Sequence, residues 1–194
     1  MMYDILKLLH VIGFAFMSIP LFNLIIVNER ALLGPKFIYP VDRYMENLIK
    51  GGVARCFVFQ STVLVTGVLL LVGGPLGIQA LWQNWVLLVK TLILFALMGL
   101  LSYVHFQLQP KIEALLADLN PDSPLPAGFM EQLRPYRIRR KKLAAFCLFL
   151  VITAIILGLQ VYGVFHPFLN VGLVALAALF AWRANKTLVR FGWF

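Results

Sequence analysis

Apolar residues fill five stretches of this chain, and each stretch is about long enough to cross a lipid bilayer as a helix. The stretches are residues 5–27, 53–73, 85–107, 143–165 and 168–185. A span needs about 20 mostly apolar residues, because roughly 30 Å of hydrocarbon is crossed at about 1.5 Å per residue. The pattern predicts an all-α, polytopic transmembrane bundle of four to five helices, forming one membrane domain over residues 1–194. The fifth stretch is the shortest and follows the fourth after a His166-Pro167 turn.

The composition supports this reading. Of the 194 residues, 61% are hydrophobic and only 13% are charged, whereas a soluble domain has about 45–50% apolar and about 25% charged residues. The first stretch is too long for a signal-peptide core and no Ala-x-Ala cleavage site follows it, so we expect it to remain as a helix. The sequence contains no P-loop, dinucleotide-binding fingerprint or zinc-ligand spacing.

The positive charges predict the orientation in the membrane. Nearly all of the 17 Lys and Arg residues fall in the linkers 28–52 and 108–142, in the tail, or next to them; the exceptions are Lys7 and Lys90. Cytoplasmic loops retain positive charge, so we expect both linkers inside the cell, the N-terminus outside and the C-terminus inside. The expected location is a bacterial cytoplasmic (inner) membrane, crossed several times.

The densest run of charge, RPYRIRRKK, begins at Arg134 and ends at Lys142, immediately before the fourth stretch. Anionic lipid headgroups attract basic residues at this position. We therefore interpret the run as a topology anchor on the bilayer, with a regulatory lipid or partner site as the alternative, and we expect no nucleic-acid partner. The linker sequence VDRYMENLIK, residues 41–50, places apolar residues on one face and predicts a short interfacial helix.

Few ionisable residues lie inside the apolar stretches, where each is costly and needs a reason. No Asp or Glu and no Arg lies within a span core; what remains is His10, Lys90 and His105, with His166 at a boundary. His10 and Lys90 are expected at nearly the same depth, close to the outer surface. His105 lies about 22 Å below Lys90, so it cannot share a metal ion with His10, although a second site at the other face is open.

His10 shares one helical face with Leu6, Gly13, Met17 and Pro20. Gly13 leaves room for a flat group or for a closely packed helix, and Met17 offers a soft thioether. A neutral imidazole in a helical bundle is the usual ligand of haem iron. The alternatives are a histidine that is hydrogen-bonded between helices and a group that transfers protons.

Lys90 also has two interpretations. In the first, its long side chain allows the ammonium group to reach the outer interface. In the second, its charge pairs with a haem propionate or with a substrate carboxylate. His105 and His166 are read mainly as interface residues.

Two segments resemble a group of small bacterial membrane proteins that includes the HemJ-type protoporphyrinogen oxidases and the CopD-type copper-resistance proteins. They are LKLLHVIG near the start and NWVLLVKTLILFALMGLLSYVHFQLQPKIEAL, residues 84–115. The resemblance implies haem b at His10 and a functional role for Lys90. The first helix lacks the Trp and the Pro-Arg pair of the HemJ type, so the match is better to the general group than to the oxidase.

These features predict a haem b-binding membrane protein with a redox or electron-transfer role near the outer face. His10 is the expected metal ligand, and Lys90, Met17 and His166 are the expected neighbours of the cofactor. A HemJ-like oxidoreductase activity is one form of this role. The alternatives are a CopD-like copper permease using His10, Met17 and His166, and a non-catalytic subunit of a homo-oligomer or of a larger membrane complex.

Overall fold

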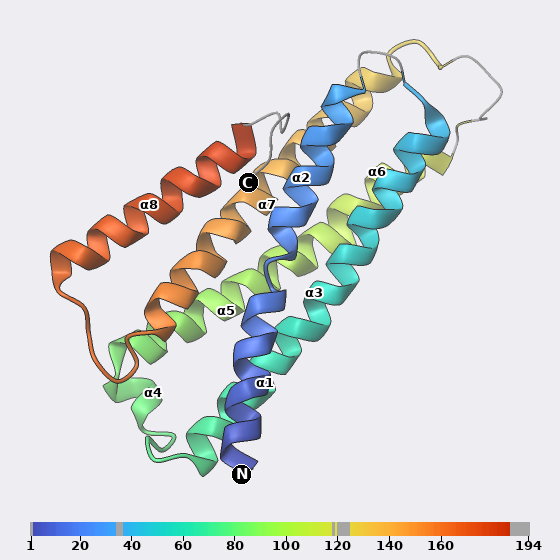
Figure 1. Ribbon diagram of the computed structural model, residues 1–194. Helices are drawn as coiled ribbons and strands as arrows, with labels where there is room; N and C mark the ends of the chain where they lie inside the picture. The colour runs from blue at the N-terminus through green and yellow to red at the C-terminus, as the bar shows by residue number, and fades with distance from the viewer. Residues whose placement is uncertain (1, 34–36, 118, 120–124, 187–194) are drawn as a thin grey trace.

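The structure is a computed structural model that describes residues 2–33, 37–117, 119 and 125–186. Its elements are α1 (Met2–Phe16), α2 (Ile19–Leu32), α3 (Tyr39–Gly73), α4 (Ala80–Gln83), α5 (Trp85–Tyr103), the π-helical turn η1 (Val104–Leu108), α6 (Gln109–Ala117), α7 (Phe129–Gly158) and α8 (Pro167–Lys186). These elements provide five helical stretches that are long and apolar enough to cross a membrane. The predicted all-α polytopic bundle is confirmed, with the fifth span present as α8 (Figure 1).

The first span is divided into two helices. α1 ends at Phe16 and α2 begins at Ile19, with Pro20 in the first turn of α2. Proline has no backbone N–H and its ring crowds the preceding turn, so it interrupts a continuous helix but is tolerated at a helix start. The sequence predicted one helix over residues 5–27; the structure keeps the span but displaces its two halves, as Figure 1 shows.

The linkers are more helical than the sequence suggested. α3 begins at Tyr39 and runs for 35 residues, a length of about 52 Å that exceeds the roughly 30 Å hydrocarbon layer. The separate interfacial helix predicted for residues 41–50 is therefore wrong, because these residues continue the membrane helix. α6 and the start of α7 extend the other linker in the same way.

A π-helical turn joins α5 to α6 at the same end of the bundle. The N–H of Gln109 donates to the carbonyl of Val104, five residues earlier. Pro110 follows directly; it has no N–H, and its ring would crowd the carbonyl of Phe106 in a regular helix. The wider turn accommodates this proline, as π-bulges commonly do.

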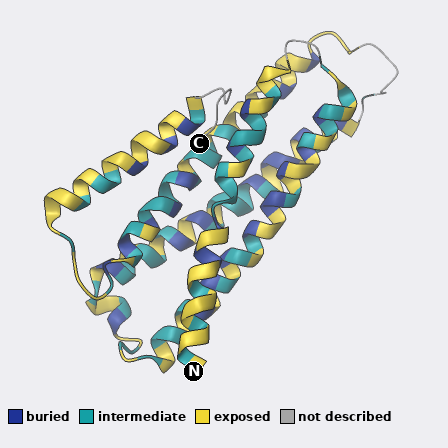
Figure 2. Cartoon of the chain, viewed as in Figure 1, coloured by how far each residue is buried: buried dark blue, intermediate teal, exposed yellow. Residues whose placement is uncertain are grey.

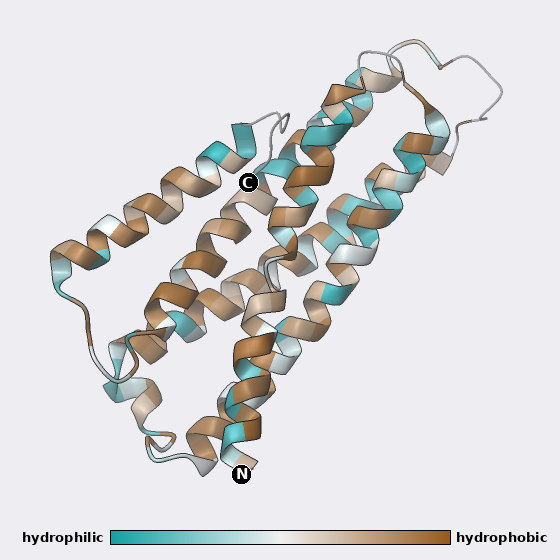
Figure 3. Ribbon diagram, viewed as in Figure 1, coloured by the Kyte–Doolittle hydropathy of each residue, from teal (hydrophilic) through white to brown (hydrophobic). Residues whose placement is uncertain are grey.

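The helices pack around a central apolar core. α1 lies on α3, α2 lies against α3 and α7, and α5 and α8 both pack on α7. The core contains Phe14, Met17, Val63, Leu94, Leu97, Val151 and Ala154. Outward-facing residues are exposed and mostly apolar over the middle of the bundle, with hydrophilic residues towards the helix ends (Figures 2 and 3). This distribution is the one expected for a surface that faces lipid.

Candidate functional site

Three polar side chains from three helices meet in the half of the bundle that holds the N-terminus. We call His10 of α1, Thr66 of α3 and Lys90 of α5 the outer site. The Nδ1 atom of His10 lies 3.0 Å from the hydroxyl oxygen of Thr66. Its Nε2 atom lies 3.5 Å from the Nζ atom of Lys90. The structure therefore brings His10 and Lys90 into contact, and it adds a threonine that sequence reasoning did not identify.

The hydrogen bonds of Thr66 assign the protonation of the imidazole. The single hydroxyl proton of Thr66 is donated to the backbone carbonyl of Thr62 at 2.6 Å. The hydroxyl oxygen then accepts from His10, so Nδ1 carries the proton and the lone pair of Nε2 accepts from the ammonium group of Lys90. This arrangement is also found in metal-binding histidines, whose second nitrogen donates to an oxygen that fixes the ring.

Lys90 is a half-buried cation without a counter-charge. Its Nζ atom lies 4.5 Å from the ring centre of Phe14, and no carboxylate among the described residues forms an ion pair with it. An ammonium group over an aromatic face gains a modest attraction, which does not replace a full negative charge. The outer site therefore carries net positive charge next to the lone pair of Nε2.

Glycines on neighbouring helices make room for the two side chains. A Cβ atom at Gly67 would lie 3.2 Å from Cε1 of His10, and one at Gly158 would lie 3.3 Å from Nζ of Lys90. A Cβ atom at Gly13 would lie 2.8 Å from a methyl carbon of Val63. Of the two roles considered for Gly13, the structure shows the closely packed helix. The bundle is therefore fitted tightly around the imidazole and the ammonium group.

The other expected neighbours of the cofactor lie elsewhere. Met17 is fully buried in the central core, two turns from His10. His166 is exposed and stacks on Phe168, and none of the contacts that the structure describes joins it to His10. His105 lies in the π-helical turn, where its ring packs edge-on against Phe57. The outer site therefore contains one histidine.

A second polar cluster lies at the opposite end of the bundle, on the extensions of α2, α3 and α7. We call Arg30, Asp42, Glu46, Arg137 and Arg140 the inner network. Glu46 is fully buried and accepts two hydrogen bonds from Arg140, at 2.6 and 2.9 Å. Arg30 also donates to Glu46 at 3.0 Å, and Arg137 donates to Asp42. Three guanidinium groups thus face two carboxylates.

The inner network holds Glu46 in its ionised form. Glu46 lies in the part of α3 that precedes the apolar residues 53–73. Burial alone would raise the pKa of its carboxyl group. The hydrogen bonds and charge of Arg140, with the charges of Arg30 and Arg137, outweigh burial and lower the pKa to about 2. An ion pair of this kind fixes the three helices relative to one another.

Sequence reasoning missed the inner network because these residues lie outside the apolar stretches and were interpreted as topology signals. A local pattern was available. Asp42 and Glu46 are four residues apart, and Ile49 and Val53 continue the same face; all four side chains are buried. Carboxylates on the face that becomes apolar further along a helix indicate burial against cationic partners.

Comparison of this chain with protein-family models, with curated proteins and with solved structures finds no match.

Proposed function

We propose that this chain is a haem b-binding integral membrane protein of a bacterial cytoplasmic membrane, with a redox or electron-transfer role near the outer face. His10 is the ligand of the iron. The observation that carries the proposal is the orientation of His10: Thr66 holds Nδ1 at 3.0 Å, so Nε2 is the unprotonated nitrogen, and it faces Lys90 of α5. Neutral histidine nitrogens of this kind bind haem iron.

The set of donors favours haem over a bare copper ion. The described residues contain no group of three or more His, Cys, Asp or Glu side chains that could hold a metal ion. A bare ion in a protein needs several protein ligands, whereas a porphyrin supplies four nitrogens and leaves one or two positions for the protein. One well-oriented histidine is enough to hold haem iron, but it is too few ligands for a bare copper ion.

The charge of the outer site also suits haem. Haem b carries two propionates, and Lys90 is a cation at the level of His10 that forms no ion pair with a carboxylate of the described residues. Nζ of Lys90 lies in front of Nε2 and the helices pack closely around both side chains, so haem binding requires the helices to separate and the lysine side chain to move. Four rotatable bonds allow this movement, and the proposed role places the ammonium group on a propionate near the interface.

The protein residues have distinct tasks in this proposal. His10 binds the iron, Thr66 fixes the imidazole tautomer, Lys90 pairs with a carboxylate of the cofactor, and Phe14 with Leu94 excludes water from the inner side. The bound haem would supply reversible one-electron exchange at its iron.

An absorbance spectrum tests the proposal. Protein produced with added haem precursor and purified in mild detergent should show a Soret band. His10→Ala should abolish the band, while His105→Ala and His166→Ala, as matched controls, should retain it. A colourless wild type that stays colourless after incubation with haem contradicts haem binding. A full band in His10→Ala contradicts the ligand assignment.

A further inference from the structure

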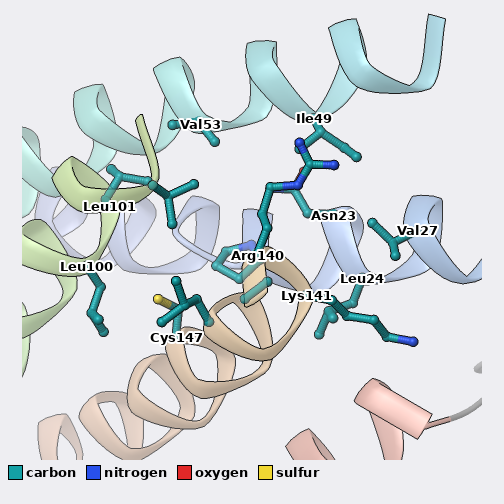
Figure 4. Close-up of a pocket in the computed structure, with 14 residues that line it drawn as sticks. Asn23, Leu24, Val27, Ile49, Val53, Leu100, Leu101, Arg140, Lys141 and Cys147 are labelled. Carbon is teal, nitrogen blue, oxygen red and sulfur yellow. The ribbon is translucent and has the colours of Figure 1, made fainter. Parts of the chain in front are cut away.

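A pocket lies at the predicted cytoplasmic end of the apolar layer, between α2, α3, α5 and α7. Most of its lining is apolar, and its polar residues are Asn23, Arg140 and Lys141. Figure 4 shows Arg140 extending from α7 towards Ile49 and Asn23, with Lys141 beside Leu24. Cationic groups thus meet apolar walls close to the level where the fourth apolar stretch begins.

One nitrogen atom of Arg140 takes no part in the hydrogen bonds of the inner network. Its two terminal nitrogens donate to Glu46 and Gln109. Its Nε atom is buried without a hydrogen-bond partner, and the residue is only 4% exposed. A buried donor without a partner destabilises the folded protein, so an acceptor in the pocket would stabilise it.

Lys141 adds a second cation with spare donors. Its Nζ atom donates to the side-chain oxygen of Asn28 at 2.6 Å, and no carboxylate among the described residues forms an ion pair with it. The three arginines of the inner network already outnumber its two carboxylates. Among the described residues, the end of the pocket therefore carries more positive than negative charge.

The size of the pocket indicates what kind of anion fits. The cavity of about 50 Å³ is far smaller than the roughly 300–1,000 Å³ of a site that encloses a whole soluble ligand. It has room for part of a molecule whose remainder lies in the bilayer. Basic residues at the cytoplasmic headgroup level attract anionic lipids.

We propose that this pocket is a specific binding site for one anionic phospholipid of the cytoplasmic leaflet. The lipid phosphate accepts from Nε of Arg140 and from Lys141, and the adjoining glycerol and acyl carbons lie against the apolar walls. This site differs from a diffuse attraction of headgroups to the basic run, because it depends on residues that line the pocket and not on charge alone. It is independent of haem binding at the outer site.

Native mass spectrometry on delipidated protein tests the proposal. The protein is titrated with phosphatidylglycerol and with phosphatidylcholine carrying identical acyl chains. The wild type should retain phosphatidylglycerol and not phosphatidylcholine. Lys141→Gln, which keeps a donor for Asn28, should bind about tenfold more weakly, the effect of one charge-assisted hydrogen bond. Lys142→Gln removes the same charge from an exposed neighbour and should bind as the wild type does.

Two further measurements distinguish a phospholipid in the pocket from a free anion and from diffuse attraction of lipids. Ala144→Phe fills the pocket without changing charge and should also reduce lipid retention. Inorganic phosphate should give no thermal stabilisation at concentrations where phosphatidylglycerol does. Equal retention of the two lipids by the wild type overturns the proposal without any variant. Equal losses of lipid binding in Lys141→Gln and Lys142→Gln would overturn the proposal in favour of diffuse attraction. Full lipid retention in Ala144→Phe would exclude the pocket as the site. Thermal stabilisation by inorganic phosphate would overturn the lipid in favour of a free anion.

Discussion

The outer site and the inner network use similar residues in opposite ways. In the inner network, buried arginines of α2 and α7 pair with carboxylates of α3. In the outer site, Lys90 forms no ion pair with a carboxylate of the described residues, and Nε2 of His10 faces this cation. Groups that pair with each other hold helices together, whereas groups without a matching partner are where a ligand gains binding energy. We therefore assign a structural role to the ion pairs of the inner network and a binding role to the outer site.

The largest expected effect is the loss of a carboxylate from the inner network. Glu46→Gln leaves three guanidinium groups around one carboxylate and should destabilise the protein by about 3–5 kcal/mol, as breaking a buried ion pair does. Thermal unfolding in detergent measures the change. Glu113→Gln is the matched control, because Glu113 pairs with Arg43 where both side chains are partly exposed (20% and 34%), and such pairs contribute about 0–1 kcal/mol. Equal losses in the two variants would contradict a structural role specific to the inner network.

Acid should weaken the inner network without substitution. The pKa of Glu46 is lowered to about 2 in the folded protein from an ordinary value of 4.5. A lowered folded-state pKa contributes stability that is fully present above pH 4.5 and is lost as the pH falls towards 2. The melting temperature should therefore fall through this window. A melting temperature in Glu46→Gln that falls as steeply as in the wild type would show that other groups carry the acid sensitivity.

The outer site should respond differently to the loss of its charge. Lys90→Met removes a half-buried cation without a counter-charge, so the apoprotein should be as stable as the wild type or more stable. Haem retention should fall, because the propionate loses its partner. Lys7→Met removes an exposed charge near the same end and should leave both properties unchanged. Strong destabilisation of Lys90→Met apoprotein would show that Lys90 is part of the scaffold.

The smallest destabilisation is expected at Thr66. Thr66→Val preserves shape and removes the oxygen that accepts from His10, a loss of about 0.6 kcal/mol for an average interhelical hydrogen bond in a membrane. Haem affinity should fall about 10–100-fold, as it does when the partner of a metal-binding histidine is removed. Thr62→Val is the control, since its hydroxyl bonds only to its own helix. An unchanged haem affinity would exclude Thr66 as the residue that orients the imidazole.

Hydropathy predicted the five spans because lipid imposes a length and a composition on each helix. It could not predict that α3 continues back to Tyr39, since polar residues continue a helix as readily as they form a loop. Pro20 carried the signal for the break between α1 and α2. Counting residues along the spans predicted that Lys90 lies at the depth of His10, but it did not predict which side of its helix Lys90 faces. Only the packing of the helices shows that Thr66 is the third residue of the outer site.

The inner network was less accessible from sequence. Its partners come from three helices, of which α7 is far from α2 and α3 in the chain, and charge counts treat Asp42, Glu46 and Arg140 as features of a cytoplasmic loop. Only packing shows that Glu46 is fully buried. The pattern of positive charge predicts an orientation, and the same arginines also hold the helices together.

Chemical rescue of the iron ligand tests haem binding at His10 most directly. His10→Gly removes the imidazole and leaves a space of its size beside Thr66 and Gly67. This variant should be folded and lack the Soret band, and added free imidazole should restore the band together with bound haem. A Soret band in His10→Gly without imidazole, or a wild type that never binds haem, would exclude His10 as the haem ligand.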